Sequence, residues 1–358
     1  MSTIQQPLKY RKAIIIWLLT GCILIAAMVV IGGITRLTGS GLSITEWKLI
    51  RGTIPPMSEA QWMEEFDNYK QIPQYQLLNY HYTLEDFKKI FFWEYFHRLL
   101  GRVIGLVFVV PFIFFWSKKQ FDRVLLKKVL LLFLLGGLQG FLGWFMVKSG
   151  LSDRTSVSHY RLAIHLVTAF ITFAVTFKVA LDVVYPNQRS NNPLLQKLYR
   201  FTWLTMGVLI LQIVYGAFVA GLKAGRIFNS WPKMDECWIS SSVTYSISQT
   251  GVAAFFDNMA VVQFVHRYVA YAVVLMFIAL YVMAHRNNAS SEETLLSKEK
   301  RMAVNLLPVA VLLQFIIGIF TLINGVPLWL GVLHQVVAFL LFGLIVFLLH
   351  RFKTTAPQ

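Results

Sequence analysis

Four of the eight histidines form two pairs with the same internal spacing: His97 with His165, and His266 with His334. Each of the four lies where a long apolar run begins. A lone histidine at such a position is usually a polar residue at a membrane interface, whereas an ionisable side chain within a span is a functional candidate. Because four matched positions are hard to explain as interfacial residues, the pattern predicts that these histidines bind a ligand.

Two neutral imidazoles from facing helices, with few cysteines nearby, suit an iron porphyrin held by two axial histidines. A zinc site would bring three or four ligands into one cluster, which a pair of histidines does not provide. Arg98 and Arg267 each follow a histidine and are candidates to pair with the propionates. The other histidines have no partner in the pattern and are interpreted as solvated or interfacial: His81, His159, His285 and His350.

The two copies of the pattern differ at one position that bears on chemistry. Glu94 precedes His97 by one helical turn, and the matching residue before His266 is Gln263. A carboxylate can transfer protons or stabilise positive charge, whereas an amide can only form hydrogen bonds. The difference suggests that the N-terminal half reacts and the C-terminal half stores or relays electrons. The simpler alternative is that Glu94 only pairs with a nearby arginine such as Arg98.

The composition indicates that lipid surrounds most of the elements that position these residues. The chain is 56% hydrophobic and 14% charged, against roughly 25% charged in soluble proteins. Apolar runs of membrane-spanning length in lipid must be α-helices, because their backbone polar groups have to bond within the segment. We expect Pro111 and Pro308 to kink their helices without ending them. The predicted spans are 13–33, 96–116, 129–147, 162–184, 201–221, 262–284, 303–323 and 329–350.

The histidine pattern belongs to an internal repeat. The segment EYFHR at 94–98 resembles QFVHR at 263–267, and Gln139-x-x-x-Gly143 resembles Gln314-x-x-x-Gly318. Four spans per copy keep both copies in one orientation, as in parallel repeats related by an axis along the membrane normal. The predicted fold is therefore an all-α membrane protein with eight transmembrane helices in two parallel-repeat four-helix bundles. The N-terminal half is 1–190 and the C-terminal half is 191–358.

The net charge of +16 is interpreted as a consequence of membrane topology and not as a surface that binds nucleic acid. The short connections are rich in Lys and Arg, as cytoplasmic loops of membrane proteins are. Both termini are then cytoplasmic, in a bacterial inner membrane. The long segment 34–95 lies outside. Ser58 and Gln61 fit a capping box, and a short amphipathic helix on the outer interface is expected from the helical spacing of Trp62, Met63, Phe66 and Tyr69.

With these residues in place, the chain resembles the haem A synthase family, in the branch shared by proteobacteria and mitochondria. The matching stretches follow the family's order over almost the whole chain: GGITRLTGSGLS (32–43), EYFHR (94–98), YRLAIHL (160–166), GAFVAGLKAG with NSWPKM (216–234), VQFVHR (262–267) and LHQVVAF (333–339). Some bacterial relatives carry a cysteine pair in the first outer loop. Residues 34–95 contain no cysteine, which puts thiol-based transfer in doubt here.

The resemblance implies oxidation of the C8 methyl of haem O to a formyl group, giving haem A for terminal oxidases, with water as the oxygen source. His97 and His165, with Arg98, would bind the substrate haem O. His266 and His334, with Arg267, would hold a resident haem b, and Glu94 matches the family's essential acid. The partners it implies are a haem O synthase that delivers substrate and an electron acceptor in the membrane. A homo-oligomer is one option for assembly.

Two other functions fit parts of the pattern. A bis-histidine cytochrome that only passes electrons would need haems at two depths, yet all four histidines are expected on one side. A transporter would place its site near the midplane between repeats, where the predicted spans carry no charged residue. The haem A synthase interpretation is therefore favoured over both.

Overall fold

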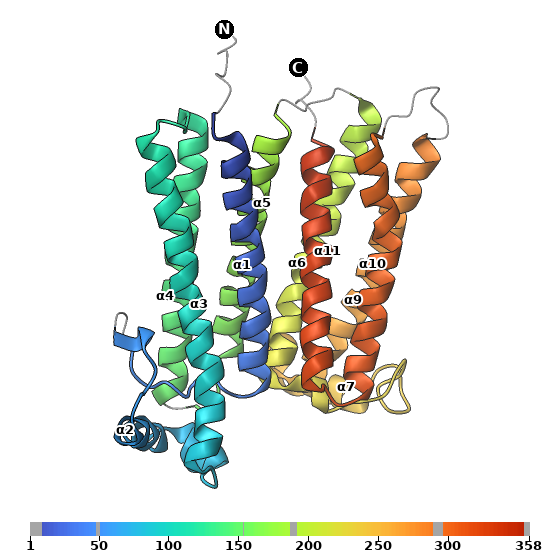
Figure 1. The fold of residues 1–358 in the computed structure, drawn as a ribbon. Helices are drawn as coiled ribbons and strands as arrows, with labels where there is room; N and C mark the ends of the chain where they lie inside the picture. Colours follow the sequence, from blue (N-terminus) through green and yellow to red (C-terminus); the bar gives the residue numbers. More distant parts are fainter. Residues whose placement is uncertain (1–8, 48–50, 153, 187–191, 289–295, 354–358) are drawn as a thin grey trace.

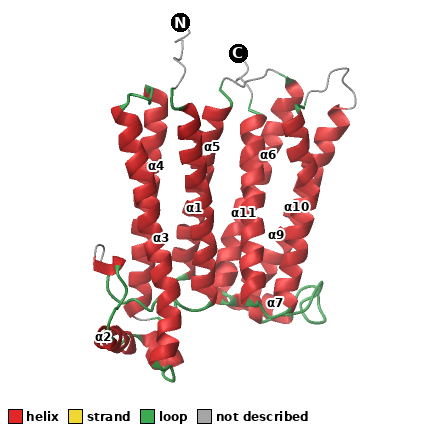
Figure 2. Cartoon of the chain, in the orientation of Figure 1, coloured by secondary structure: helices red, strands yellow, loops and turns green. Residues whose placement is uncertain are grey.

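The computed structural model describes residues 9–47, 51–152, 154–186, 192–288 and 296–353, and in these ranges the chain is helical (Figures 1 and 2). The α-helices are α1 (Arg11–Leu37), α2 (Glu59–Lys70), α3 (Leu84–Ser117), α4 (Arg123–Ser152), α5 (His159–Val184), α6 (Pro193–Leu222), α7 (Ser241–Thr250), α8 (Ala254–Asp257), α9 (Met259–Asn288), α10 (Lys298–Ile323) and α11 (Leu328–Arg351).

Within the described residues, eight of these helices are long and apolar enough to cross a membrane: α1, α3, α4, α5, α6, α9, α10 and α11. All eight predicted spans are therefore confirmed, and the all-α membrane fold with them. Pro111 lies inside α3 and Pro308 inside α10, and both helices continue through the proline, as expected. Helix α1 begins and α11 ends at one end of the bundle, whereas α2 and α7 lie at the opposite end (Figure 1).

The helices that carry the four histidines start earlier than the apolar runs do. Helix α3 begins at Leu84 because the side chains of Thr83 and Asp86 form a capping box that satisfies backbone N–H groups. His97 therefore lies several turns into α3, and not at a helix start as expected. His165, His266 and His334 lie in the second turns of α5, α9 and α11.

The capping box at Ser58 and the helix that follows it are confirmed, and the structure shows which element this helix packs on. In α2, Phe66 and Tyr69 are buried, and their rings lie 5.1 and 5.2 Å from that of Phe87 in α3. Burial raises the pKa of Tyr69 to about 12. The aromatic side chains of α2 thus pack on the protein, because α3 extends far enough to offer them an aromatic face. The location of α2 on the outer membrane interface stays a prediction.

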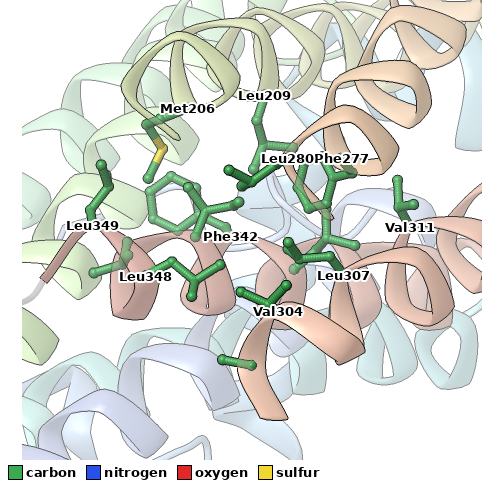
Figure 3. Packing of buried hydrophobic residues seen from close by; sticks show 14 of the residues in the cluster. Met206, Leu209, Phe277, Leu280, Val304, Leu307, Val311, Phe342, Leu348 and Leu349 are labelled. Carbon is green, nitrogen blue, oxygen red and sulfur yellow. The ribbon is translucent and has the colours of Figure 1, made fainter. Parts of the chain in front are cut away.

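The spanning helices pack as two groups, which we call the N-terminal group (α1, α3, α4 and α5) and the C-terminal group (α6, α9, α10 and α11). The largest buried cluster of the described residues lies mainly in the C-terminal group, where it includes Met206, Phe277 and Phe342 (Figure 3), and it extends to residues of α1 and α5. The groups meet where α1 packs on α11 and where α5 packs on α6 and α11. The predicted boundary between residues 190 and 191 lies outside the described residues.

Candidate functional site

Each of the four paired histidines packs against a glycine on a neighbouring helix. A Cβ at Gly32 would lie 3.3 Å from His97 Nε2, and one at Gly143 would lie 3.4 Å from His165 Cε1. A Cβ at Gly216 would lie 3.3 Å from His266 Cε1, and one at Gly318 only 2.8 Å from His334 Cε1. All four imidazoles therefore rest against bare backbone, a close approach that a larger residue would block.

In the C-terminal group, each of the two imidazoles is also contacted by one glutamine side chain. The amide nitrogen Nε2 of Gln212 lies 3.4 Å from His266 Nε2, and that of Gln314 lies 3.1 Å from His334 Nδ1. Each glutamine lies one helical turn before the glycine that contacts the same histidine. An amide N–H can only donate, so each contact suits a neutral imidazole whose one lone pair accepts the hydrogen bond. The same lone pair is the one that would bind a metal, so the amide and a metal compete for it.

The corresponding position in α4 is Gln139, whose side-chain nitrogen is buried without a partner in the described part of the chain, as is Nδ1 of His165. In α1 the corresponding residue is Met28. A buried polar atom without a partner is costly, so these orphaned atoms are consistent with a ligand between α4 and α5. The N-terminal histidines thus lack the amide contacts that the C-terminal ones have.

The imidazoles are paired within each group. His97 and His165 lie on α3 and α5, which both pack on α1, and His266 and His334 lie on α9 and α11, which both pack on α6 and α10. Within the described residues, no set of three or more His, Cys, Asp or Glu side chains is placed to hold a metal ion directly. Two imidazoles resting against glycine backbone fit the axial ligands of a haem, whose flat ring needs space that a Cβ would fill. The donor set and its surroundings therefore fit haem, and they do not form a zinc site.

Glu94 is buried in α3 and faces the loop that follows α1. Its Oε2 accepts hydrogen bonds from Ser43 Oγ at 2.8 Å and from the Ile44 backbone N–H at 2.9 Å. Its Oε1 accepts one from Arg98 Nη2 at 2.6 Å. The pairing with Arg98 considered as an alternative role is therefore present. A carboxylate offers about four acceptor positions, so these three donors leave about one for water or substrate.

The matching residues in the C-terminal group hold a loop in a different way. Gln263 donates to Phe228 O at 3.1 Å, and Arg267 donates to the carbonyls of Phe228 and Ser230 at 2.6 and 2.9 Å. Arg98 likewise donates to Ile44 O at 2.9 Å as well as to Glu94. Both arginines thus donate hydrogen bonds to loop carbonyls. Their pairing with haem propionates stays a prediction.

Two of the histidines without a repeat partner were misjudged. His159 and His350 are both buried, and each lies beside an aspartate: His159 Nε2 is 3.3 Å from Asp257 Oδ1, and His350 Nε2 is 3.1 Å from Asp182 Oδ1. No pairing signal is visible in the sequence, because each aspartate lies on a different helix from its histidine. The glutamines were also missed as site residues, although the Gln-x-x-x-Gly spacing that recurs in α4, α6 and α10 marks them.

Comparison with known proteins identifies the family. The model of the COX15-CtaA family, described as cytochrome oxidase assembly proteins, matches residues 15–346. A haem A synthase of Flavobacterium psychrophilum is 47% identical over 97% of this chain and 100% of its own length. One of Flavobacterium johnsoniae is 46% identical over 96% of this chain and 98% of its own. A proteobacterial one, of Rhodospirillum centenum, is 45% identical over 98% and 91%.

The family predicted from the histidine, arginine and glycine motifs is therefore confirmed. The match extends over both helix groups, and the four paired histidines and Glu94 lie within the matched residues. On the strength of this full-length similarity, the chain belongs to the COX15-CtaA family of cytochrome oxidase assembly proteins.

Proposed function

We propose that this chain is a haem A synthase, which oxidises the C8 methyl of haem O to a formyl group. The observation that carries the proposal is the presence of two imidazoles in each helix group, every one resting against a glycine of a neighbouring helix. Relatives that bear the name haem A synthase match over nearly their whole length, and they support the same activity.

The proposal assigns the two halves of the chain to different haems. Residues 1–190 would bind haem O through His97 and His165, and residues 191–358 would hold a resident haem b through His266 and His334. When bound, haem b would supply one-electron acceptance. The difference between Glu94 and Gln263 supports this division, because only the N-terminal half carries a carboxylate at this position of the repeat.

Glu94 is proposed to act on the substrate side. Each oxidation of the methyl carbon removes two electrons and a proton, and the hydroxyl of a water molecule becomes bonded to that carbon as the water loses one of its two protons. Two rounds give a gem-diol, which loses water to become the aldehyde. A buried carboxylate can stabilise positive charge developing on the carbon or accept the proton from water. The acceptor position left on Glu94 would serve that water, while Ser43, Ile44 and Arg98 hold the carboxylate in place.

The substrate would come from a haem O synthase, and the electrons would pass to an acceptor in the membrane. We place the protein in the bacterial inner membrane with both termini in the cytoplasm, since α1 begins and α11 ends at one end of the bundle (Figure 1). The site would then lie toward the outer side, near the end that carries α2 and α7.

Extraction of the pigments tests the function directly. Purified protein from cells that also make haem O should yield haem B together with haem O or haem A on chromatography. Haem B is expected because a resident cofactor remains bound, and haem O and haem A are expected as substrate and product. An electron-transfer cytochrome would yield haem B without the others, and that result would contradict the proposal.

Reporter fusions test the orientation. Fusions after Gln120 should be active in the cytoplasm, and fusions after Tyr75 or Ser240 should be active outside, because Lys and Arg concentrate near the short connections. A fusion partner active only outside, such as alkaline phosphatase, gives the measurement. Activity of that partner after Gln120 would invert the topology and place every paired histidine near the cytoplasm.

A further inference from the structure

The two helix groups meet at two equivalent contacts, α1 with α11 and α6 with α5, and these contacts differ in chemistry. The repeat aligns Gly32–Gly33 with Gly216–Ala217, and His165–Leu166 with His334–Gln335. In the α6–α5 contact, Ala217 and Leu166 lie in one apolar cluster. At the same positions in the α1–α11 contact, the chain has Gly33 and Gln335.

Gln335 bridges the two groups through a hydrogen bond. Its Nε2 donates to the backbone carbonyl of Val29 in α1 at 2.8 Å. Its Oε1 lies so close over Gly33 that any Cβ there would overlap it, and the same Cβ would lie 3.0 Å from Gln335 Cδ. Gly33 is therefore the residue that lets the amide reach α1. A leucine would fill this space without the cost of burying an amide.

Both ends of this bridge lie next to a proposed haem ligand. Gln335 directly follows His334 in α11. Gly33 directly follows Gly32, whose backbone packs against His97. A movement of His97 against α1 would therefore reach the backbone beside His334 through one hydrogen bond and one close contact. Where α6 packs on α5, an apolar contact takes the place of this hydrogen bond.

We infer that Gln335 is a positioning residue that couples the two proposed haem sites. Filling the site at His97 and His165 presses on the turn of α1 that Gln335 holds, and this changes the orientation of His334. The inference rests on the proposed function, because it takes the two histidine pairs as haem ligands. Axial imidazole orientation affects the electronic state of low-spin haem iron, so the coupling is visible in the resident haem's spectrum.

The test uses a double variant that copies the other contact. Gly33→Ala with Gln335→Leu gives the residue pair already present as Ala217 and Leu166, so the packing is one that this protein accommodates elsewhere. Gln335→Leu alone is the second variant and keeps the glycine. Gly33→Ala alone is the matched control for steric damage, because its methyl would overlap the amide of Gln335.

Detergent-solubilised protein carrying haem b is titrated with haem O, and the electron paramagnetic resonance signal and midpoint potential of haem b are recorded before and after. In the unmodified protein we expect haem O to shift both quantities. In the double variant and in Gln335→Leu we expect haem b to stay bound, thermal stability to change little, and the shift to be largely lost. The same shift in all three proteins, or none in the unmodified protein, would overturn the inference.

The pigment profile of the same preparations keeps the two proposals apart. If haem A accumulates with the unmodified protein while the shift does not depend on Gln335, the coupling fails and the proposed function stands. If neither haem O nor haem A is ever recovered, the function itself fails. If the double variant loses haem b while Gln335→Leu keeps it, the coupling is tested with the Gln335→Leu variant alone.

Discussion

Substitution of His266 or His334 with alanine is expected to abolish the low-spin haem b spectrum of the purified protein. Each histidine supplies one of two axial ligands in the proposal, and loss of either would leave five-coordinate iron. Alanine would also leave the contact with Gly216 or Gly318 empty without introducing a clash. The measurement is the reduced-minus-oxidised optical spectrum, normalised to the amount of protein in the membrane.

The matched variants are His97→Ala and His165→Ala, which should leave haem b in place and eliminate haem A formation. Gln314→Leu tests the amide contact without removing a ligand. Its amide nitrogen lies 3.1 Å from His334 Nδ1 and donates to an imidazole lone pair, so its removal should leave haem b bound. If the N-terminal variants lost haem b and the C-terminal ones kept it, the assignment of the two halves would be reversed.

Glu94→Gln is expected to reduce the rate of haem A formation by about 10²–10³-fold, the usual cost of losing one well-placed electrostatic or acid–base group. The amide keeps the shape of the carboxylate but removes its charge and one of its two accepting oxygens. Protein level and haem b should stay near normal, and haem O or its singly hydroxylated form should accumulate. The ratio of haem A to these two pigments in membranes supplied with haem O is the measurement.

The structure adds a complication that the control must resolve, since Glu94 also anchors the loop after α1. Breaking a buried ion pair typically costs about 3–5 kcal/mol, and Arg98 would lose its carboxylate partner. Ser43→Ala removes one anchoring hydrogen bond and leaves the charge. If chemistry is the main role, Ser43→Ala should lower turnover far less than Glu94→Gln does. Equal losses in the two variants, or an unchanged pigment ratio in Glu94→Gln, would leave Glu94 as a structural anchor.

The structure also changes how Glu94 and Gln263 should be compared. By sequence they are a carboxylate and its amide counterpart at one position of a repeat. In the fold, Glu94 accepts the backbone N–H of Ile44, whereas Gln263 donates to the backbone carbonyl of Phe228. The two loops therefore present opposite polar groups to α3 and α9. The amide oxygen of a glutamine at position 94 could accept both loop hydrogen bonds, but its NH2 group would then face the guanidinium of Arg98, donor against donor.

The sequence by itself determined the eight spanning helices, their proline-containing members, the four paired histidines and the family. Each of these depends on local information: a run of apolar residues long enough to cross a membrane, or a motif repeated along the chain. Helix starts were less accurate. The run that gives the membrane signal ends where polar residues begin, while the helix continues to its cap, as Thr83 shows for α3.

Only the tertiary structure decided which helix faces meet. The spanning helices are apolar almost all round, so their sequences do not show which side packs on which neighbour. The contact of Gly318 with His334, the bridge from Gln335 to Val29 and the burial of His159 beside Asp257 all join residues on different helices. Their partners are fixed by the rotation and crossing of packed helices, which is a property of the whole bundle and not of any one segment.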